Sequence, residues 1–370
     1  MNTLTKEYVN TIADNFQYEG ELLDIQPYGS GHINDTFLLS FNLPNGTMGY
    51  SILQRMNTEI FGEPIKLMEN IVNITSFLRK KIICMGGDPN RETLNVIQAK
   101  DGKAYYKDAR NMYWRSYIFI TEATSFDQVQ NPRDFYESAV AFGHFQNMLS
   151  DYPANTLHEI IPGFHDTKSR FDNFLNALHK DSYNRAQEVQ EEIKFVLEHE
   201  NLSTSLGRLQ GNGEIPLRVT HNDTKLNNIM IDDKTRKGIC VIDLDTVMPG
   251  LAINDFGDSI RFGASTAAED ETDLEKVSCD LNLFELYVEG FLKGCDGSLT
   301  QKEIELLPLG AKVMTYECGM RFLTDYLEGD HYFKIHRPTH NLDRCRTQFK
   351  LVRDMEMKWD QMQQIIRKYI

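Results

Sequence analysis

The sequence predicts an α+β fold with two lobes: a small N-terminal lobe built on an antiparallel sheet with one helix, and a larger, mainly helical C-terminal lobe. Strand-like runs concentrate before residue 120, and apolar patterns of helical period dominate after it. With 370 residues, 41% of them hydrophobic, the chain can bury a large core shared between two lobes. We therefore expect lobes over residues 1–120 and 121–370.

The N-terminal lobe is expected to contain several short strands and one amphipathic helix. Alternating apolar residues bounded by turn formers mark the strands. The expected strands cover residues 22–28, 32–41, 50–55, 95–98, 104–107 and 112–120. The expected helix covers residues 64–81, where apolar residues lie mostly on one side and charged residues on the other. This helix would pack on the sheet.

Gly29, Ser30 and Gly31 join the first two expected strands. Glycines at such a turn let backbone amides approach phosphate oxygens closely, which suggests a nucleotide-phosphate loop. His32 and Asn34 follow the turn and could direct polar groups toward phosphate or substrate. Asn34 also replaces the third glycine of the Gly-x-Gly-x-x-Gly pattern, so an ordinary hairpin remains the alternative.

The C-terminal lobe is expected to be built from helices. Their expected ranges are 132–149, 170–179, 187–198, 274–292, 302–327 and 343–369. A catalytic loop and a hairpin interrupt this series between residues 218 and 243. The chemistry of the chain is expected there.

Residues His221 to Asn228 have the His-x-Asp-x-x-x-x-Asn spacing of a kinase catalytic loop, with Asn222 where an arginine is usual. Phosphoryl transfer needs an acidic group for the acceptor hydroxyl, ligands for magnesium and a cradle for phosphates. Asp223 is the expected base. Lys225, two residues further on, could offset charge that develops on the transferring phosphate.

An expected hairpin would bring Asn228 beside Asp243. Two apolar runs, residues 228–231 and 239–242, flank a polar stretch of turn-forming residues. Folding this hairpin joins an amide oxygen and a carboxylate, which are ligands that Mg²⁺ accepts. Asn228 and Asp243 are therefore the expected metal ligands. The alternative is that these acids only cap turns.

Asp255-Phe256-Gly257 spells the magnesium-binding triplet of protein kinases but follows the hairpin and the Pro249-Gly250 turn. We expect Asp255 instead to accept backbone hydrogen bonds from the catalytic loop. Asp245 is left open between a second metal ligand and a structural acid.

The segment from Phe119 to Glu122 is the expected hinge. Adenine binds between apolar walls with two backbone hydrogen bonds at an extended connector. Phe119, Ile120 and Glu122 are therefore predicted to contact the nucleotide; a plain edge strand is the alternative.

Gln54 occupies the third-strand position where kinases carry a phosphate-binding lysine. Arg55 should point to the other face, and Glu69 is a doubtful partner acid on the helix.

Composition excludes several classes of partner. The net charge of −15 argues against nucleic acid and anionic membranes, which select basic surfaces. The six cysteines lack paired metal spacing and are expected to be reduced thiols of a cytoplasmic protein. No apolar run approaches membrane-spanning length, and no export signal is apparent. The oligomeric state stays open, with a monomer compatible.

These motifs resemble the aminoglycoside phosphotransferase and choline kinase superfamily, whose members share a bilobal protein-kinase-like fold. The resemblance spans nearly the whole chain. Within that superfamily, five stretches look like those of N-acetylhexosamine 1-kinases: residues 28–34, 218–228, 242–250, 255–263 and 317–322.

The resemblance implies ATP as co-substrate, Mg²⁺ as cofactor, and phosphorylation of the anomeric hydroxyl of N-acetylglucosamine or N-acetylgalactosamine. It implies Asp223 as the base, Asn228 and Asp243 as metal ligands, and Arg321 and Tyr332 as residues that hold the sugar. His32, Asp223 and Asp243 complete the predicted substrate site. Arg321 could instead pair along its own helix with Glu317 and Asp325. The alternatives are another acceptor (an aminoglycoside, choline, homoserine or another hexose), and a nucleotide-binding regulator with impaired catalysis, which the absent lysine at position 54 motivates.

Overall fold

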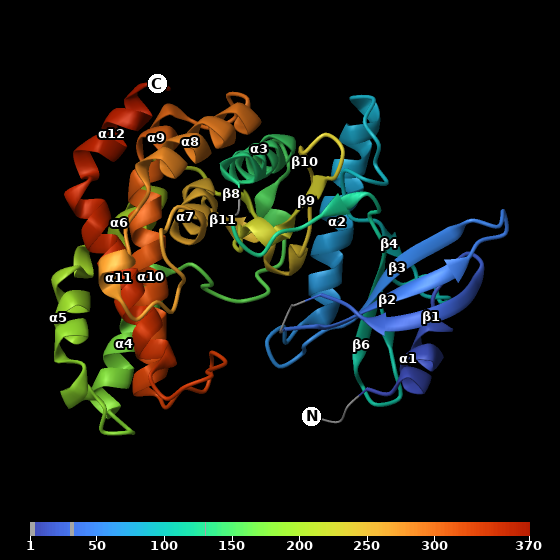
Figure 1. Ribbon diagram of the computed structural model, residues 1–370, viewed down its shortest axis with the longest axis horizontal. Helices are drawn as coiled ribbons and strands as arrows, with labels where there is room; N and C mark the ends of the chain where they lie inside the picture. Colours follow the sequence, from blue (N-terminus) through green and yellow to red (C-terminus); the bar gives the residue numbers. More distant parts are fainter. Residues whose placement is uncertain (1–3, 30–32, 130) are drawn as a thin grey trace.

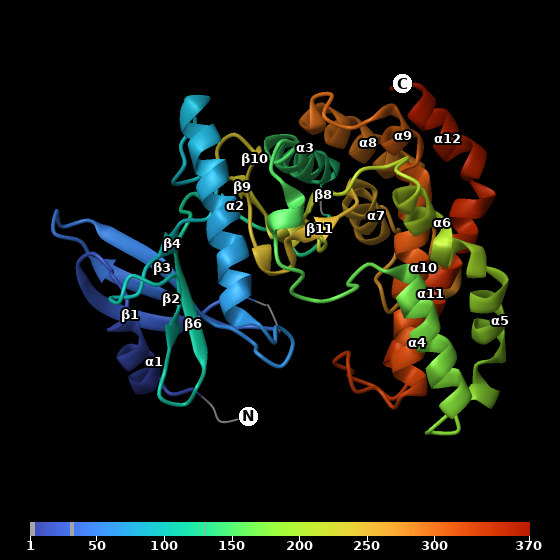
Figure 2. The same ribbon diagram turned by 180° about the vertical axis from the view of Figure 1, so that it is seen from behind.

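The computed structural model describes residues 4–29, 33–129 and 131–370, and they form the expected α+β, two-lobed architecture (Figure 1). An antiparallel sheet fills the N-terminal part and a larger set of helices the C-terminal part. The long helix α2 (Pro64–Cys84) lies between them, as the opposite view also shows (Figure 2). The exact lobe boundary at residue 120 stays a proposal.

The N-terminal sheet has the strand order β1-β2-β3-β6-β4, with β5 paired to β6, and all its pairings are antiparallel. The strands are β1 (Glu21–Pro27), β2 (Asp35–Asn42), β3 (Met48–Arg55), β4 (Val96–Ile97), β5 (Tyr106–Lys107) and β6 (Tyr113–Ile118). All six expected strands are therefore present with shifted ends. The expected start of the second strand at His32 lies outside the described residues.

The two faces of this sheet are covered differently because residues alternate along each strand. Leu53 of β3 packs with α1 (Lys6–Ala13), a helix that the sequence analysis missed. Its neighbour Ile52 packs on the other side, in the core that α2 shares with residues of the C-terminal lobe. Helix α2 thus joins the sheet to the larger lobe.

The C-terminal lobe packs around two central helices, α7 (Ala252–Gly263) and α10 (Leu307–Leu327), which contact each other extensively. The surrounding helices are α3 (Pro132–Met148), α4 (Thr167–Lys180), α5 (Gln190–Glu198), α6 (Glu200–Gly211), α8 (Leu281–Cys295), α9 (Gln301–Glu305), α11 (His340–Met357) and α12 (Trp359–Arg367). None of the helices in the described part of the chain is long and apolar enough to cross a membrane.

Several expected helix boundaries were wrong, each for a local reason. The helix expected over residues 274–292 begins only at Leu281, because the Asp280 side chain caps it. The helix expected from residue 302 is broken at Leu306, where α10 begins anew with Pro308 in its first turn. The one expected over residues 343–369 is likewise divided at Lys358.

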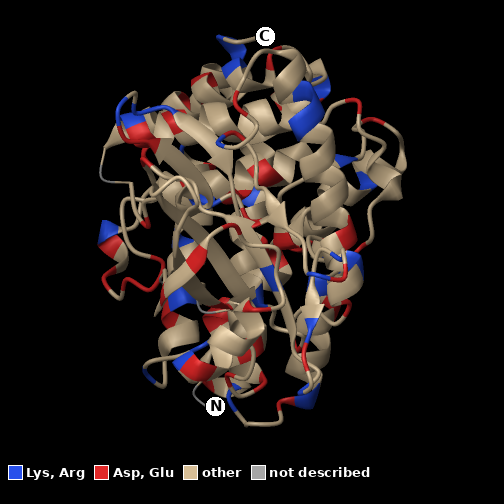
Figure 3. Cartoon of the chain, turned by 90° about the vertical axis from the view of Figure 1, so that its right-hand side faces the viewer, with Lys and Arg blue, Asp and Glu red and all other residues tan. Residues whose placement is uncertain are grey.

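Acidic and basic residues are interspersed along helices and loops of both lobes (Figure 3). Many of them form ion pairs across the surface, such as Lys368 with Glu285. The acidic excess in the composition is therefore spread over the fold.

Candidate active site

The catalytic loop leaves strand β8 (Arg218–Thr220), passes through a short 3-10 turn (Leu226–Asn228) and enters strand β9 (Ile229–Asp232). Its start is held by Asp255 on α7, whose carboxylate accepts the backbone N–H groups of His221 at 2.9 Å and Asn222 at 2.8 Å. This confirms the structural role expected for Asp255. The kinase-like Asp-Phe-Gly triplet is part of a helix here.

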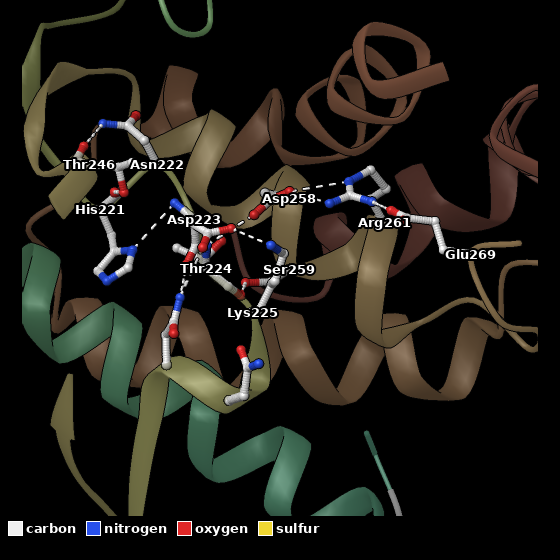
Figure 4. A network of polar contacts seen from close by, with 12 residues as sticks. His221, Asn222, Asp223, Thr224, Lys225, Thr246, Asp258, Ser259, Arg261 and Glu269 are labelled. Atoms are coloured by element: carbon white, nitrogen blue, oxygen red, sulfur yellow. Dashed lines mark hydrogen bonds and ion pairs between the residues drawn. The ribbon is translucent and has the colours of Figure 1, made fainter. Parts of the chain in front are cut away.

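The rest of the loop is bound to α7 by polar contacts, drawn in Figure 4. Asp258 accepts the Thr224 N–H at 3.0 Å, and Ser259 donates to the Thr224 carbonyl at 2.7 Å. Arg261 bonds Asp258 and Glu269, which fixes the Asp258 carboxylate. The Thr224 backbone is therefore held on both sides by side chains of α7.

Asp223 projects from this loop between Lys225 and Asn228. The Lys225 ammonium lies 2.9 Å from one carboxylate oxygen, and the Asn228 amide nitrogen lies 3.2 Å from the other. Burial raises the pKa of Asp223, but the charge and hydrogen bond of Lys225 outweigh it and hold the pKa below its ordinary value. Asp223 is therefore an ionised carboxylate near neutral pH.

The hairpin of β9 and β10 (Gly238–Val241) forms as expected and joins Asn228 to Asp243. The Ile242 N–H donates to the Asn228 carbonyl at 2.9 Å, so the two candidate ligands lie at the open end of the hairpin, opposite its turn. Asp243 adopts the left-handed conformation with φ of 58°. The side chains of Asn228 and Asp243 therefore start from adjacent backbone positions.

The donor set fits a hard divalent cation. Among the described residues no hydrogen bond occupies the Asn228 side-chain oxygen or the Asp243 carboxylate. Burial, followed by repulsion from Asp245 and Asp223, raises the pKa of Asp243. A cation would relieve that repulsion. The described residues contain no cluster of three His, Cys, Asp or Glu ligands, and Mg²⁺ at kinase sites commonly uses few protein ligands together with phosphates.

The candidate hinge is an extended connector, because β6 ends at Ile118 and the next strand, β7 (Ala123–Thr124), pairs with β9. The Ile120 carbonyl and the Glu122 N–H have no hydrogen-bond partner among the described residues. An acceptor and a donor two residues apart suit the edge of adenine. The Glu122 side chain turns to Lys234, at 2.9 Å, so only its backbone is available.

Tyr28, which precedes the glycine turn, lies next to this hinge. The ring of Phe119 contacts those of Tyr28 and Tyr50, with centroids 5.6 and 6.2 Å apart. Gly29, after Tyr28, has φ of +81° and open space where a Cβ would stand. Ser30, Gly31 and His32 lie outside the described residues, so their predicted roles stay predictions.

Gln54, at the position where kinases carry a lysine, is hydrogen-bonded to side chains of the two neighbouring strands. It accepts a hydrogen bond from Arg115 of β6 at 3.0 Å and donates to Thr36 of β2 at 3.0 Å. Arg115 also forms a buried ion pair with Asp245, whose carboxylate is thereby engaged in a structural contact.

Arg55 points to the other face of the strand, as strand alternation predicted, and pairs with Asp35. Glu69 pairs with His158 and takes no part.

Arg321 faces aromatic rings and has no carboxylate partner in the described chain. Its guanidinium lies 5.8, 5.7 and 5.4 Å from the ring centroids of Phe164, Tyr332 and Phe333. Among the described residues no ion pair joins Arg321 to Glu317 or Asp325 of its own helix, although its charge helps to lower the pKa of Glu317. Glu317 binds His165 and Thr167, and Asp325 accepts the backbone N–H groups of residues 331–333.

His165 and Arg170 are residues near the site that the sequence analysis missed. His165 lies 2.9 Å from Glu317 and 3.0 Å from the Asn222 carbonyl, so it joins α10 to the catalytic loop. Arg170 donates to the Phe164 carbonyl at 2.9 Å, and its buried Nε has no partner. Nothing in the spacing of these residues signals the contacts, which depend on how α4 packs on α10.

The comparisons agree with this site. The model of a phosphotransferase enzyme family, APH, matches residues 106–278, which include the candidate hinge, the catalytic loop, the hairpin and α7. The matched segment is thus the part of the chain that contains the candidate active site.

Solved kinases of similar fold cover nearly the whole chain. A choline kinase from Cryptosporidium parvum is 14% identical with a TM-score of 0.60, and each chain is covered to 99%. Amicoumacin kinase hAmiN, in complex with AMP-PNP, Ca²⁺ and Ami, is 11% identical with a TM-score of 0.58 and 93% coverage of both chains. Spectinomycin phosphotransferase APH(9)-Ia, in complex with ADP and spectinomycin, is 12% identical with a TM-score of 0.57, covering 97% of this chain and 100% of that one. These similarities establish the protein-kinase-like fold.

Proposed function

We propose that this chain transfers the γ-phosphoryl group of ATP, with Mg²⁺, to the anomeric hydroxyl of an N-acetylhexosamine, N-acetylglucosamine or N-acetylgalactosamine. The observation that carries the phosphotransfer is the ionised Asp223 held between Lys225 and Asn228, with Asp243 adjoining. The choice of sugar rests on the resemblance of the five sequence stretches.

In this mechanism Asp223 accepts the proton of the acceptor hydroxyl as its oxygen attacks the γ-phosphorus. The bond from that phosphorus to the bridging oxygen breaks, and ADP leaves with the bonding electrons. Lys225, beside Asp223, places a positive charge where the transferring oxygens gather negative charge. Asn228 and Asp243 would hold Mg²⁺, which neutralises phosphate charge when bound.

The nucleotide would lie between the glycine turn and the hinge. Gly29, Ser30 and Gly31 would approach the phosphates, while Phe119 and Ile120 would provide apolar contacts for the base. The backbone of Ile120 and Glu122 has an unpaired acceptor and an unpaired donor for it. Gln54 is already engaged by Arg115 and Thr36, so we assign it a supporting role for the phosphates.

Acceptors with other chemistry are the alternative, since the structural neighbours include enzymes named for choline, amicoumacin and spectinomycin. The side chains near the loop favour an uncharged acceptor. Arg321 and Arg170 both contact Phe164, which precedes His165 and its bond to the catalytic loop, and neither forms an ion pair with a described carboxylate. Two unpaired guanidinium groups repel a polycation and donate well to sugar oxygens. Arg321, Tyr332 and His32 are therefore proposed substrate contacts.

The test is ADP release from ATP and Mg²⁺ across a panel of N-acetylhexosamines, other hexoses, aminoglycosides, choline and homoserine. Phosphorus NMR then locates the phosphate. An anomeric phosphate on N-acetylglucosamine or N-acetylgalactosamine is the expected product. Preferred turnover of a cationic acceptor would reject the sugar assignment, and nucleotide binding without turnover of any acceptor would favour the impaired regulator.

A base variant tests the mechanism. Asp223→Asn keeps the size of the side chain but cannot take a proton, so kcat should fall about 10²- to 10⁴-fold, the usual contribution of a general base. Calorimetry with AMP-PNP and Mg²⁺ is the control for an intact nucleotide site. Full turnover by folded Asp223→Asn protein is incompatible with the proposed role.

A further inference from the structure

A buried ion pair crosses from the N-terminal sheet to the turn that follows Asp243. The Arg115 and Asp245 side chains are 2% and 4% exposed. Both terminal nitrogens of Arg115 bond the Asp245 carboxylate, one of them at 2.9 Å. Such fork-to-fork pairs fix orientation as well as charge.

Further residues hold the pair from the N-terminal side. Arg115 donates its remaining Nε–H to Gln54, which bonds Thr36, so three adjacent strands support the guanidinium. Asn34, after the glycine turn, donates to Asp245 at 2.8 Å and accepts the Asn57 N–H at 2.9 Å. Both oxygens of Asp245 are thus satisfied by side chains of the N-terminal part.

Within the described chain, in contrast, no group donates a hydrogen bond to the Asp243 carboxylate. Its backbone is in the left-handed region at φ of 58°, which costs a non-glycine residue energy and needs external support. Asp245 is two residues away, in the 3-10 turn Leu244–Thr246. The position of Asp243 therefore depends on what holds that turn.

We propose that the Arg115–Asp245 pair is a positioning device that holds Asp243 in place for the magnesium–nucleotide complex. Kinases carry a lysine at the position of Gln54 in β3. In this chain Arg115 of β6 supplies the buried positive charge instead. Arg115 also balances the charge of Asp245, so that the negative charge available to a cation is concentrated on Asp243. The inference rests on the proposed function in so far as Asp243 is taken as a metal ligand.

The experiment is calorimetric titration of Mg²⁺ with AMP-PNP in the absence of acceptor, on wild type, Asp245→Asn and Arg115→Lys. Residues that orient a metal ligand typically contribute about 10- to 100-fold to metal affinity, and we expect losses in that range for both variants. An affinity unchanged in folded Asp245→Asn protein overturns the inference.

The matched control is Glu303→Gln, which breaks another buried, two-bonded pair. Glu303 bonds Arg218 at 2.6 and 2.8 Å, and neither residue contacts Asp243. This variant should lose stability but keep its Mg²⁺ affinity. An equal loss of affinity in Glu303→Gln would mean that general destabilisation is the cause, which overturns the inference.

If a single variant does not fold, the double variant Arg115→Met/Asp245→Leu decides, because replacing both charges by apolar groups commonly restores stability. We expect it to fold and still bind Mg²⁺ weakly; wild-type affinity in it overturns the inference. Failure of wild type to bind Mg²⁺ and AMP-PNP would overturn the proposed function as well. Normal binding without turnover of any sugar would reject only the proposed acceptor.

Discussion

Arg321 and Arg170 show how single side chains bear on the choice of acceptor. They come from different helices and meet at Phe164. Burial and then the charge of Arg321 lower the pKa of Arg170, and they outweigh the opposing effect of the Glu317 carboxylate. A bound oxygen-rich molecule would supply the missing acceptors.

Arg321→Met should raise the KM of the acceptor about 10- to 100-fold, because a hydrogen bond to a charged group contributes about 1.5–3 kcal/mol. The KM of ATP should stay unchanged, since the aromatic contacts of Arg321 are with Phe164, Tyr332 and Phe333 and not with the candidate hinge. Arg353→Met is the control. Arg353 is an exposed residue of α11, and its guanidinium also lies over an aromatic ring, that of Phe195. Steady-state kinetics measure both; an unchanged acceptor KM in Arg321→Met would reject the contact.

His165 should make stability depend on pH. Burial lowers its pKa, but the hydrogen bond and charge of Glu317 outweigh this and raise the pKa above the ordinary value. A raised folded pKa stabilises the protein fully below the unfolded value of about 6.5, and the contribution is lost as pH rises through the folded value.

The stability difference between wild type and His165→Gln should therefore be larger near about pH 6 than near about pH 9. Each unit by which the pKa is raised corresponds to about 1.4 kcal/mol. Urea unfolding at both pH values measures the difference. His179→Gln is the control, because His179 is an exposed histidine of α4 and its replacement shows how loss of a surface histidine changes stability between the two pH values. A difference that grows toward high pH would contradict the ion pair.

At the scale of elements, the site depends on how closely α7 approaches α10. Gly257 and Gly310 let the two helices touch, since a Cβ on Gly257 would stand 2.4 Å from the Gly310 carbonyl oxygen. Helix α7 supplies Asp255 and Asp258 to the catalytic loop. Its placement therefore also places Asp223.

Gly257→Ala should destabilise the fold by about 1–3 kcal/mol, because the added methyl group overpacks this crossing. Gly207→Ala, in exposed helix α6 with open space around it, should stabilise the fold by about 0.5–1 kcal/mol. Denaturant unfolding compares the two. A neutral Gly257→Ala would show that the helices can separate at little cost.

At the scale of the molecule, the candidate nucleotide site draws on both lobes. Gly29 and the candidate hinge follow strands of the N-terminal sheet, whereas Asn228 and Asp243 flank the hairpin that precedes α7. A ligand that contacts both should stabilise the whole fold through binding to the native state alone.

AMP-PNP with Mg²⁺ should raise the free energy of unfolding by about 2.7 kcal/mol when present at about 100 times its dissociation constant. Removal of Mg²⁺ with EDTA should abolish most of this gain. Thermal unfolding measures it, and Asp243→Asn should show a smaller gain than wild type. Equal stabilisation with and without Mg²⁺ would argue against a metal at Asp243.

Contiguous motifs allowed the local geometry of the candidate site to be predicted. Asp223, Lys225 and Asn228 lie within six residues, and the hairpin that joins Asp243 to them is local, so spacing was sufficient. Helix ends were less predictable. The start of α8 depends on the Asp280 cap, and the break before α10 coincides with Pro308.

The sequence by itself determined the two-lobed α+β class, the catalytic loop and the hairpin, because hydrophobic period and local turn chemistry act over a few residues. Only the tertiary structure decided the partners of Arg115, His165 and Arg321. These contacts join strands and helices far apart in the chain, and cross-strand register and helix packing set which side chains meet. Local sequence does not encode that geometry.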